Sequence, residues 1–164
     1  MKKLLILGTA DCLNEDLEYV ELNDFDIFAV NQAGIVRPDI NIKALVTYHP
    51  YEMLAEGWIT QRKDSGGSDG YDIVLNGRCE AAENIYGARI VYAKDTPRPG
   101  QSGSSALLAV FHGMALGYQL ILLAGCPLDG KYARFRQAWT KNKVFFAGRV
   151  RSFSGWTKEL LGGV

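Results

Sequence analysis

The side chains best suited to chemistry in this sequence stand directly after short apolar runs. They are Gly8, Thr9, Asn31, His49, Ser102, Gly103, Ser104, Ser105, Gly125 and Asp129. Serines that begin a helix bring free backbone N–H groups and a partial positive charge to a phosphate, and glycines let a ligand approach the backbone. An asparagine amide offers a donor and an acceptor to a base edge or a ribose hydroxyl. Gly8, Asn31, Ser102, Gly103, Ser104 and Gly125 are therefore nucleotide-binding candidates.

These features also have structural interpretations that the sequence leaves open. Serine is a preferred N-cap residue whatever a protein does, and a glycine serves equally well in a tight turn. His49 could cap a turn, and Asp129 stands before Gly130, which is typical of a turn.

Few residues could act as general acids or bases. His49 follows an apolar run, and a histidine imidazole can act as a base or a hydrogen-bond donor near neutral pH, so we name His49 as a catalytic candidate, together with Asp129. His112 lies inside an apolar helical pattern and is expected to be structural. Cys126 has no histidine beside it in the sequence and is expected to be a small core residue.

The elements that must position these residues alternate between strand and helix patterns. Strands are expected at Lys3 to Leu7, Asp26 to Val30, Lys43 to Tyr48, Tyr71 to Leu75, Arg89 to Tyr92 and Gln119 to Ala124, with one more at Val144 to Ala147. Helices are expected at Leu13 to Leu22, Tyr51 to Gln61, Ala106 to Leu116 and Tyr132 to Trp139, and after Ser154 as N-cap. This order predicts an α/β fold, a Rossmann-like three-layer α/β/α arrangement with a mostly parallel twisted sheet. Ligands of such sheets bind outside the carboxyl ends of the strands.

Composition narrows the functional classes. The chain has 164 residues, a formal net charge of zero and three cysteines that form no pair or cluster with the two histidines. We expect one domain over residues 1–164, a cytoplasmic setting, no metal and no cofactor. No apolar run approaches the ~20 residues that span a bilayer, so no membrane partner is expected. Neither G-x-G-x-x-G nor G-x-x-x-x-G-K-[ST] occurs, which argues against the usual NAD enzymes and P-loop NTPases.

The zero net charge conceals two segregated blocks. Seven acids and no base lie between Leu4 and Val36, whereas eight bases and no acid lie from Lys131 to Lys158. The blocks could simply be solvated faces that attract each other. Alternatively, the basic segment 131–164 packs near the ligand edge, with Arg149 and Arg151 binding a phosphate or another anion.

Several short segments, taken in order, carry a resemblance to known families. They are Met1 to Gly8, Asn23 to Phe28, Asn31-Gln32, Tyr48-His49-Pro50, Ser102-Gly103, Ala115 to Tyr118 and Leu123 to Gly125. Over residues 1 to about 130 the chain resembles the nucleotide-binding domain of bacterial CMP-sialic acid sialyltransferases, and it is similar to pterin pyrophosphokinase-like domains. The whole chain, especially Gly103 to Leu107 and Gly148 to Thr157, also resembles small proteins of tailed bacteriophages.

The sialyltransferase resemblance implies nucleotide contacts from Gly8, Thr9, Asn31, Ser102 and Gly103. His49 replaces an asparagine that touches the nucleotide in that family, so His49 is also a binding candidate. The family's Gly-Asn-Gly loop is Gly8-Thr9-Ala10 here, and its acid after the later strand is Pro127. Its catalytic histidine has no counterpart, because no histidine follows His112.

Three functions follow as hypotheses. The first is a nucleotide- or nucleotide-sugar-binding protein, with a small glycosyltransferase-like enzyme of phage origin as its catalytic form. The second is a non-catalytic phage accessory protein that sequesters a nucleotide or binds a host partner. The third, nucleic-acid binding through the basic block and Phe145, Phe146, Phe153 and Trp156, ranks below them because the chain is not basic overall. The base, the sugar, the acceptor and the oligomeric state are left open.

Overall fold

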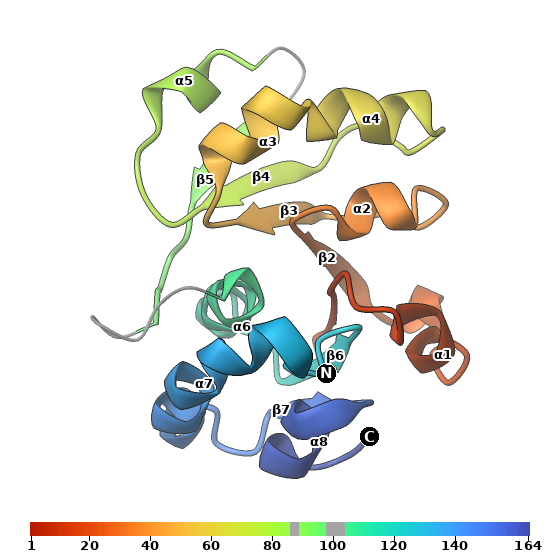
Figure 1. Ribbon diagram of the computed structural model, residues 1–164, viewed down its shortest axis with the longest axis vertical. Coiled ribbons are helices and arrows are strands. Elements are labelled where there is room, and N and C mark those ends of the chain that lie inside the picture. The colour runs from red at the N-terminus through yellow and green to blue at the C-terminus, as the bar shows by residue number, and fades with distance from the viewer. Residues whose placement is uncertain (86–88, 98–103) are drawn as a thin grey trace.

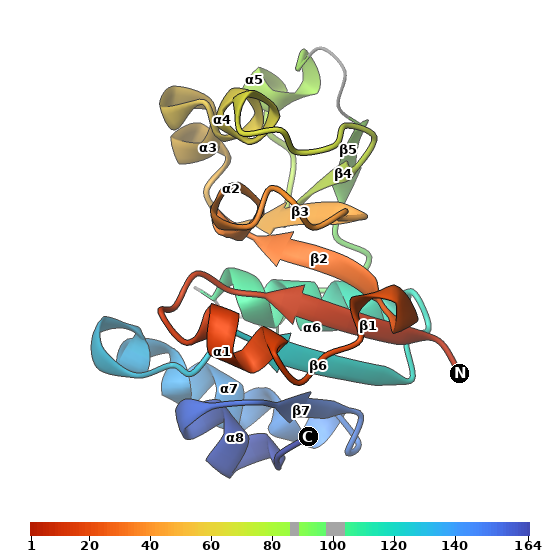
Figure 2. The ribbon, with the colours of Figure 1, turned by 90° about the vertical axis from the view of Figure 1, so that its right-hand side faces the viewer.

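The computed structural model describes residues 1–85, 89–97 and 104–164, and within them the strands form one parallel sheet. Its order is β5-β4-β3-β2-β1-β6-β7. The strands are β1 (Lys3–Leu7), β2 (Asp26–Val30), β3 (Ala44–Thr47), β4 (Asp72–Leu75), β5 (Arg89–Tyr92), β6 (Leu120–Ala124) and β7 (Val150–Ser152). Every neighbouring pair of strands is parallel, and Figure 2 shows the arrows of β1 and β2 pointing the same way. The expected α/β fold with a parallel sheet is confirmed.

The sheet changes its winding direction at β1. From β1 the chain adds β2 to β5 on one side and then returns to add β6 and β7 on the other. The register pairs Leu5 with Ile27 on one edge of β1 and with Leu122 on the other edge. The carboxyl ends of β1 and β6 therefore flank the switch point, where ligands of open α/β sheets bind.

Both faces of the sheet are covered, which explains the unbroken apolar strands (Figure 1). Alternate residues of β1 belong to different cores: Leu4 and Ile6 face one, and Leu5 and Leu7 face the other. The first core also holds α6 (Ser105–Ala115) and α7 (Arg136–Asn142), with α8 (Gly155–Leu161) packed against it. The opposite core contains residues of α1 (Leu13–Leu17), α2 (Ala33–Val36), α3 (Pro50–Glu56), α4 (Trp58–Asp64) and α5 (Glu80–Glu83).

Helix α6 has no polar face because it lies between the sheet and later segments. Every residue from Ser105 to Gly113 is buried. Its N-cap is Ser104, whose Oγ accepts a hydrogen bond from the Leu107 N–H at 3.3 Å. The serine at this position thus caps the helix, as one of the two interpretations expected.

Several expected elements differ from those observed. The first helix ends at Leu17, five residues earlier than expected, and the helix expected over Tyr51 to Gln61 is broken into α3 and α4. The break lies at Gly57, which has a φ of 68° and cannot continue a right-handed helix. Tyr132 to Trp139 divides into η2 (Gly130–Phe135), a 3-10 helix, and the start of α7.

The strand expected at Val144 to Ala147 is wrong. This apolar run contributes instead to η3 (Lys143–Phe145), and the last strand, β7, begins at Val150. Phe146 packs edge-on against Phe111 and Trp139, with ring centroids 6.1 and 6.0 Å apart. Val144 is 76% exposed and Phe145 beside it is 39% exposed. Buried and exposed residues therefore do not alternate along this run, as they would in a strand with one buried face.

Candidate functional site

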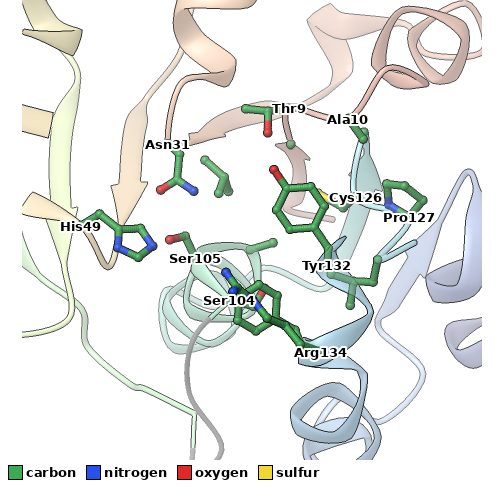
Figure 3. A pocket seen from close by; sticks show the side chains of 16 residues that line it. Thr9, Ala10, Asn31, His49, Ser104, Ser105, Cys126, Pro127, Tyr132 and Arg134 are labelled. Atoms are coloured by element: carbon green, nitrogen blue, oxygen red, sulfur yellow. The ribbon is translucent and has the colours of Figure 1, made fainter. Parts of the chain in front are cut away.

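A small cavity of about 110 Å³ opens at the carboxyl ends of β1, β2, β3 and β6 (Figure 3). The turn after β1 and the start of α6 form two of its walls, and η2 forms a third. Its lining residues are Gly8, Thr9, Ala10, Val30, Asn31, His49, Ser104, Ser105, Ala106, Gly125, Cys126, Pro127, Leu128, Tyr132, Arg134 and Phe135. The structure therefore brings Gly8, Thr9, Asn31, His49, Ser104 and Gly125 together in one place. Ser102 and Gly103 lie outside the described residues.

Gly8 is required by the close approach of two strand ends. Its backbone N–H donates to the carbonyl of Ala124 at 2.8 Å. A Cβ at Gly8 would lie 2.2 Å from the carbonyl oxygen of Gly125 and 2.5 Å from Sγ of Cys126. Only a glycine lets β1 and β6 end so close together, and this approach forms the floor of the cavity.

Asn31 leaves β2 in an unusual backbone conformation. Its φ is 52°, in the left-handed region that asparagine tolerates better than most residues. The backbone N–H donates to the Val46 carbonyl at 3.1 Å, and Oδ1 accepts from the hydroxyl of Thr47 at 2.8 Å. Figure 3 shows the Asn31 amide directed into the cavity.

The start of α6 presents hydrogen-bond donors to the cavity. Ser104 and Ser105 are nearly buried, with 5% and 4% of their surfaces exposed. Ser104 Oγ accepts from Leu107 N–H and from Trp139 Nε1–H at 3.2 Å. Ser105 Oγ accepts from the Tyr48 N–H at 3.1 Å. The first backbone N–H groups of an eleven-residue helix add a partial positive charge here.

Two site residues, Tyr132 and Arg134, were missed by the sequence analysis. Both belong to η2 and line the cavity opposite Asn31 (Figure 3). The Arg134 guanidinium lies over the Phe135 ring, 4.8 Å from its centroid. The basic block from Lys131 was the available signal, but the turn that aims Arg134 could not be derived from the sequence pattern.

The two expected anion-binding arginines lie elsewhere. Arg149 precedes β7 and therefore sits at the amino end of the sheet, where its Nε donates to the Phe146 carbonyl at 3.3 Å. Arg151 lies within the edge strand β7 and donates to the Gly163 carbonyl at 3.2 Å. Neither lines the cavity. Of the expected basic segment 131–164, η2 lines the small cavity, and Ser154 and Gly155 line an adjoining hollow.

The two catalytic candidates do not share a cavity. His49 lines the small cavity with a side chain that is 43% exposed, and its Nδ1 lies 3.7 Å from Oε1 of Glu52. Asp129 lines an adjoining, more open hollow of about 550 Å³ and pairs with Arg136 at 2.7 Å. The hollow shares Thr9, Ala10, Pro127 and Tyr132 with the cavity.

The small cavity has a one-sided electrostatic character. Arg134 contributes a positive charge, and no aspartate or glutamate is among the lining residues. Burial raises the pKa of the Cys126 thiol, so this cysteine stays protonated and is a poor nucleophile. In the described part of the chain, no three histidine, cysteine or acidic side chains gather as metal ligands. The charge of the cavity lining is therefore positive, which favours an anion over a cation.

Comparison with known proteins gives structural relatives only. No protein-family model matches the sequence, and no curated protein sequence matches it. Within the described ranges, no helix is long and apolar enough to cross a membrane.

The fold is similar to that of the sialyltransferase CstII from Campylobacter jejuni solved with cytidine-5'-monophosphate, with a TM-score of 0.67 at 17% identity over 99% of this chain and 85% of that chain. The same enzyme with CMP-3FNeuAc gives a TM-score of 0.69 at 16% identity, over the same shares. CST-II with a trisaccharide acceptor and CMP gives 0.67 at 16% identity, covering 99% and 86%. At these identities the likeness establishes the fold.

Proposed function

We propose that this protein binds a nucleotide or nucleotide sugar, with a phosphate group in the cavity at the start of α6. The observation that carries the proposal is the convergence of hydrogen-bond donors there. Asn31 follows β2, Ser104 and Ser105 begin α6, and Tyr132 and Arg134 belong to η2, so three separate segments supply the donors. No carboxylate lines the same cavity. Donors without a competing acid favour an acceptor-rich anion such as a phosphate. The CMP-bound structures of similar fold support a nucleotide as the molecule that carries this phosphate.

The size of the cavity supports a ligand that extends beyond it. Pockets for ligands of this class commonly measure about 300–1,000 Å³. The cavity holds about 110 Å³ and the adjoining hollow about 550 Å³, so a nucleotide sugar would occupy both. Tyr132 stands between them, because it lines each.

The catalytic form of the proposal is a glycosyltransferase-like reaction. The bond between the anomeric carbon and a phosphate oxygen would break as an acceptor oxygen attacks, and the acceptor proton would pass to a base. Arg134 and the N-terminus of α6 are suited to stabilise the charge on the departing phosphate. His49 is the candidate base that faces the phosphate cavity. Asp129, across Tyr132 in the hollow, is the second candidate, although its pair with Arg136 occupies one of its oxygens.

A non-catalytic role as a nucleotide-sequestering protein is the second candidate. The specific observation in its favour is that His49 is the sole titratable base beside the phosphate cavity among the described residues. In either form, the resemblance to tailed-phage proteins supports a phage origin and the host cytoplasm as the setting. Nucleic-acid binding is less well supported, because Phe146 is packed in the core and unavailable for stacking on bases.

Calorimetry with CMP, CDP, UDP, ADP and GDP tests nucleotide binding directly. We expect at least one to bind in the micromolar to millimolar range, and Tyr132→Phe to weaken that binding. Tyr19→Phe is the matched control, since Tyr19 is 80% exposed and lines neither hollow. No binding of any of the five at millimolar concentration would contradict the proposal.

Mass spectrometry separates the two forms of the proposal. After incubation with CMP-, UDP- and GDP-sugars, an enzyme releases a nucleotide, whereas a sequestering protein returns each ligand unchanged. Loss of turnover in His49→Ala with nucleotide binding retained would assign the base to His49. Equal turnover in His49→Ala would exclude that role.

A further inference from the structure

The hydroxyl of Thr47 joins two residues of the candidate site. Thr47 is the last residue of β3 and is fully buried, with 0% exposure. Its Oγ1 lies 2.8 Å from Oδ1 of Asn31, and the backbone N–H of His49 donates to the same Oγ1 at 2.9 Å. One buried oxygen therefore contacts both a binding candidate and a catalytic candidate. Thr47 itself lines neither the small cavity nor the adjoining hollow.

The two contacts fix the direction of each hydrogen bond. A backbone N–H can only donate, so Thr47 Oγ1 accepts from His49. Its single proton is then available for Asn31, which must present an oxygen to it. With the Asn31 amide reversed, the buried Thr47 proton would have no acceptor among the described residues, a costly arrangement.

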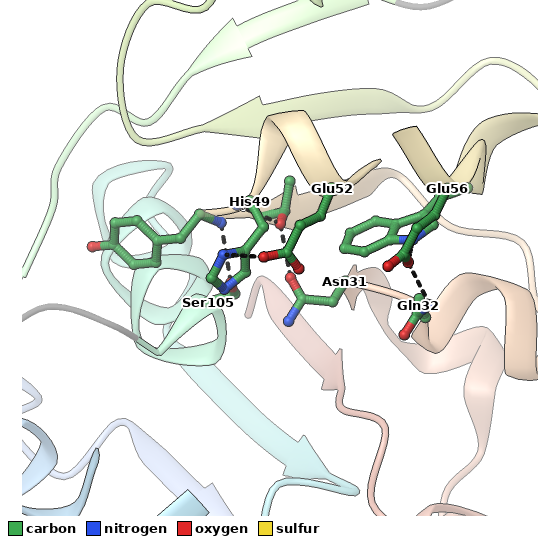
Figure 4. Close-up of polar contacts among 9 residues, drawn as sticks. Asn31, Gln32, His49, Glu52, Glu56 and Ser105 are labelled. Atoms are coloured by element: carbon green, nitrogen blue, oxygen red, sulfur yellow. Dashed lines mark hydrogen bonds and ion pairs between the residues drawn. The ribbon is translucent and has the colours of Figure 1, made fainter. Parts of the chain in front are cut away.

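The free end of the Asn31 amide is consequently its NH₂ group. No described residue accepts a hydrogen bond from Asn31 Nδ2, and Figure 4 shows this nitrogen turned away from the dashed contacts around His49 and Glu52. The backbone of Asn31 is also held, by its left-handed φ of 52° and its bond to Val46. Both the place and the polarity of this donor are set before a ligand arrives.

Ser104 and Ser105, at the start of α6, are also available to the ligand as hydrogen-bond donors. The oxygen of Ser105 is engaged by the Tyr48 N–H, and that of Ser104 by Leu107 N–H and Trp139 Nε1–H. Each serine keeps its own proton to donate. Asn31 thus completes a set of donors, instead of offering the mixed donor and acceptor of an unconstrained amide.

We propose that Thr47 is a positioning residue that makes Asn31 a dedicated donor, so that the ligand must place an unprotonated oxygen against Asn31 Nδ2. This inference rests on the proposed nucleotide-binding function and deepens it. A phosphoryl oxygen and a pyrimidine carbonyl oxygen share the required chemistry, whereas a ligand group that can only donate is rejected. Thr47 acts through Asn31 and need not touch the ligand.

Two substitutions at Thr47 test whether its hydroxyl orients the Asn31 amide. Thr47→Val keeps the shape of the side chain but removes the hydroxyl, and Thr47→Ser keeps the hydroxyl. By calorimetry with CMP, we expect Thr47→Val to weaken binding about fivefold, which is the contribution of one ordinary hydrogen bond. We expect the affinity of Thr47→Ser to stay within about twofold of that of the unaltered protein. Equal losses in both variants, or no loss in Thr47→Val, would overturn the proposal.

Asn31→Asp gives a second test, the pH dependence of CMP affinity. A purely structural role of Asn31 would not change this pH dependence. At pH 7 the nearly isosteric carboxylate presents acceptors only, so we expect CMP affinity to fall at least tenfold relative to the unaltered protein. Below about pH 4, the ordinary pKa of an aspartate, protonation restores a donor, and the affinities of the variant and the unaltered protein for CMP should move closer together. An unchanged ratio across this pH range would contradict the dedicated-donor role, even if Thr47→Val failed to fold.

Cytidine distinguishes the two sources of the oxygen. If Asn31 faces the phosphate, Asn31→Asp weakens CMP but not cytidine, and if it faces the base, both weaken alike. Failure of the unaltered protein to bind any nucleotide would remove the proposed function itself. Normal CMP binding that is indifferent to Thr47→Val and Asn31→Asp would remove only the inference about Thr47.

Discussion

The carboxylate of Asp16 accepts a hydrogen bond from the backbone N–H of Gly125, with 2.8 Å between Oδ2 and the nitrogen. The same oxygen accepts from the hydroxyl of Ser154 at 2.9 Å. Because the Ser154 proton is used there, the Cys12 thiol at 3.2 Å donates to Ser154 Oγ. Asp16 is 5% exposed, so one member of the acidic block serves as an internal anchor between α1, the end of β6 and the segment before α8.

Replacing Asp16 should therefore destabilise the whole fold. Asp16→Ala leaves the Gly125 N–H and the Ser154 hydroxyl without their acceptor, and hydrogen bonds to a charged group contribute about 1.5–3 kcal/mol each. We expect the free energy of unfolding in urea to fall by about 3 kcal/mol. The control is Glu15→Ala, an exposed neighbour on the same helix, which should change it by less than about 0.5 kcal/mol. Similar values for the two variants would reduce Asp16 to an ordinary surface acid.

A methyl group at Gly8 should separate the ends of β1 and β6. The added Cβ would lie 2.2 Å from the Gly125 carbonyl oxygen, and a backbone atom cannot move away cheaply. We expect Gly8→Ala to lose about 1–3 kcal/mol of stability and to weaken CMP binding, because the cavity floor is displaced. Gly77→Ala is the control, since a Cβ there meets nothing within 4 Å. A Gly8→Ala protein as stable as Gly77→Ala would show that this approach is not tight in solution.

Arg134, not Arg149 or Arg151, should govern anion binding. Arg134→Ala removes the one charged side chain that lines the cavity in the described structure, so CMP affinity should fall about tenfold or more. The remaining binding should also depend less on ionic strength. Arg149→Ala, at the amino end of the sheet, should leave CMP affinity unchanged. Titrations of both variants at two salt concentrations make the comparison, and the opposite ranking would restore the assignment made from the sequence.

Protonation of His112 should weaken the fold in mildly acidic solution. Its Nδ1 accepts from the Lys94 N–H at 3.1 Å, and burial, assisted by the Lys94 charge, lowers its pKa below 6.5. The unfolded chain therefore takes up the proton first, and stability falls as the pH drops from 6.5 through the lower folded pKa.

Urea unfolding between pH 7.5 and 4.5 measures this effect. His112→Gln retains a side-chain acceptor but does not titrate, so it should show a shallower fall in stability than the unaltered protein. His49→Gln is the matched histidine control, because the His49 side chain is 43% exposed. Parallel curves for the unaltered protein and His112→Gln would assign the acid sensitivity to other groups.

The sheet was accessible from the sequence because most of its strands are short apolar runs, and β1, β2, β3 and β6 are buried on both faces. Asp26–Val30 and Arg89–Tyr92 begin and end where expected. The segment from Gly130 to Ala147 was less accessible, because its helices are short and partly 3-10 and its apolar residues follow no period. The last helix, α8, begins directly after Ser154, as expected. Phe146 is buried while Phe145 beside it is 39% exposed, a contrast that only tertiary packing against Phe111 and Trp139 creates.

The candidate site divides in the same way. Gly8, Asn31, His49 and Ser104 follow or begin regular elements, so parallel topology was enough to bring them to one edge. Tyr132 and Arg134 reach that edge through the irregular turn of η2, which no periodicity announces. The role of Asp16 was also hidden, because its partners Gly125 and Ser154 are distant in the chain and one of them is a backbone group.

The order of the strands has a consequence for synthesis of the chain. β1 leaves the ribosome first, yet one of its two neighbours, β6, leaves only after residue 124. Until then the Leu5 edge of β1 that later pairs with Leu122 stays open to other strands, and an open apolar edge invites aggregation. A chain that ends before η2 also lacks the cavity wall that carries Tyr132 and Arg134.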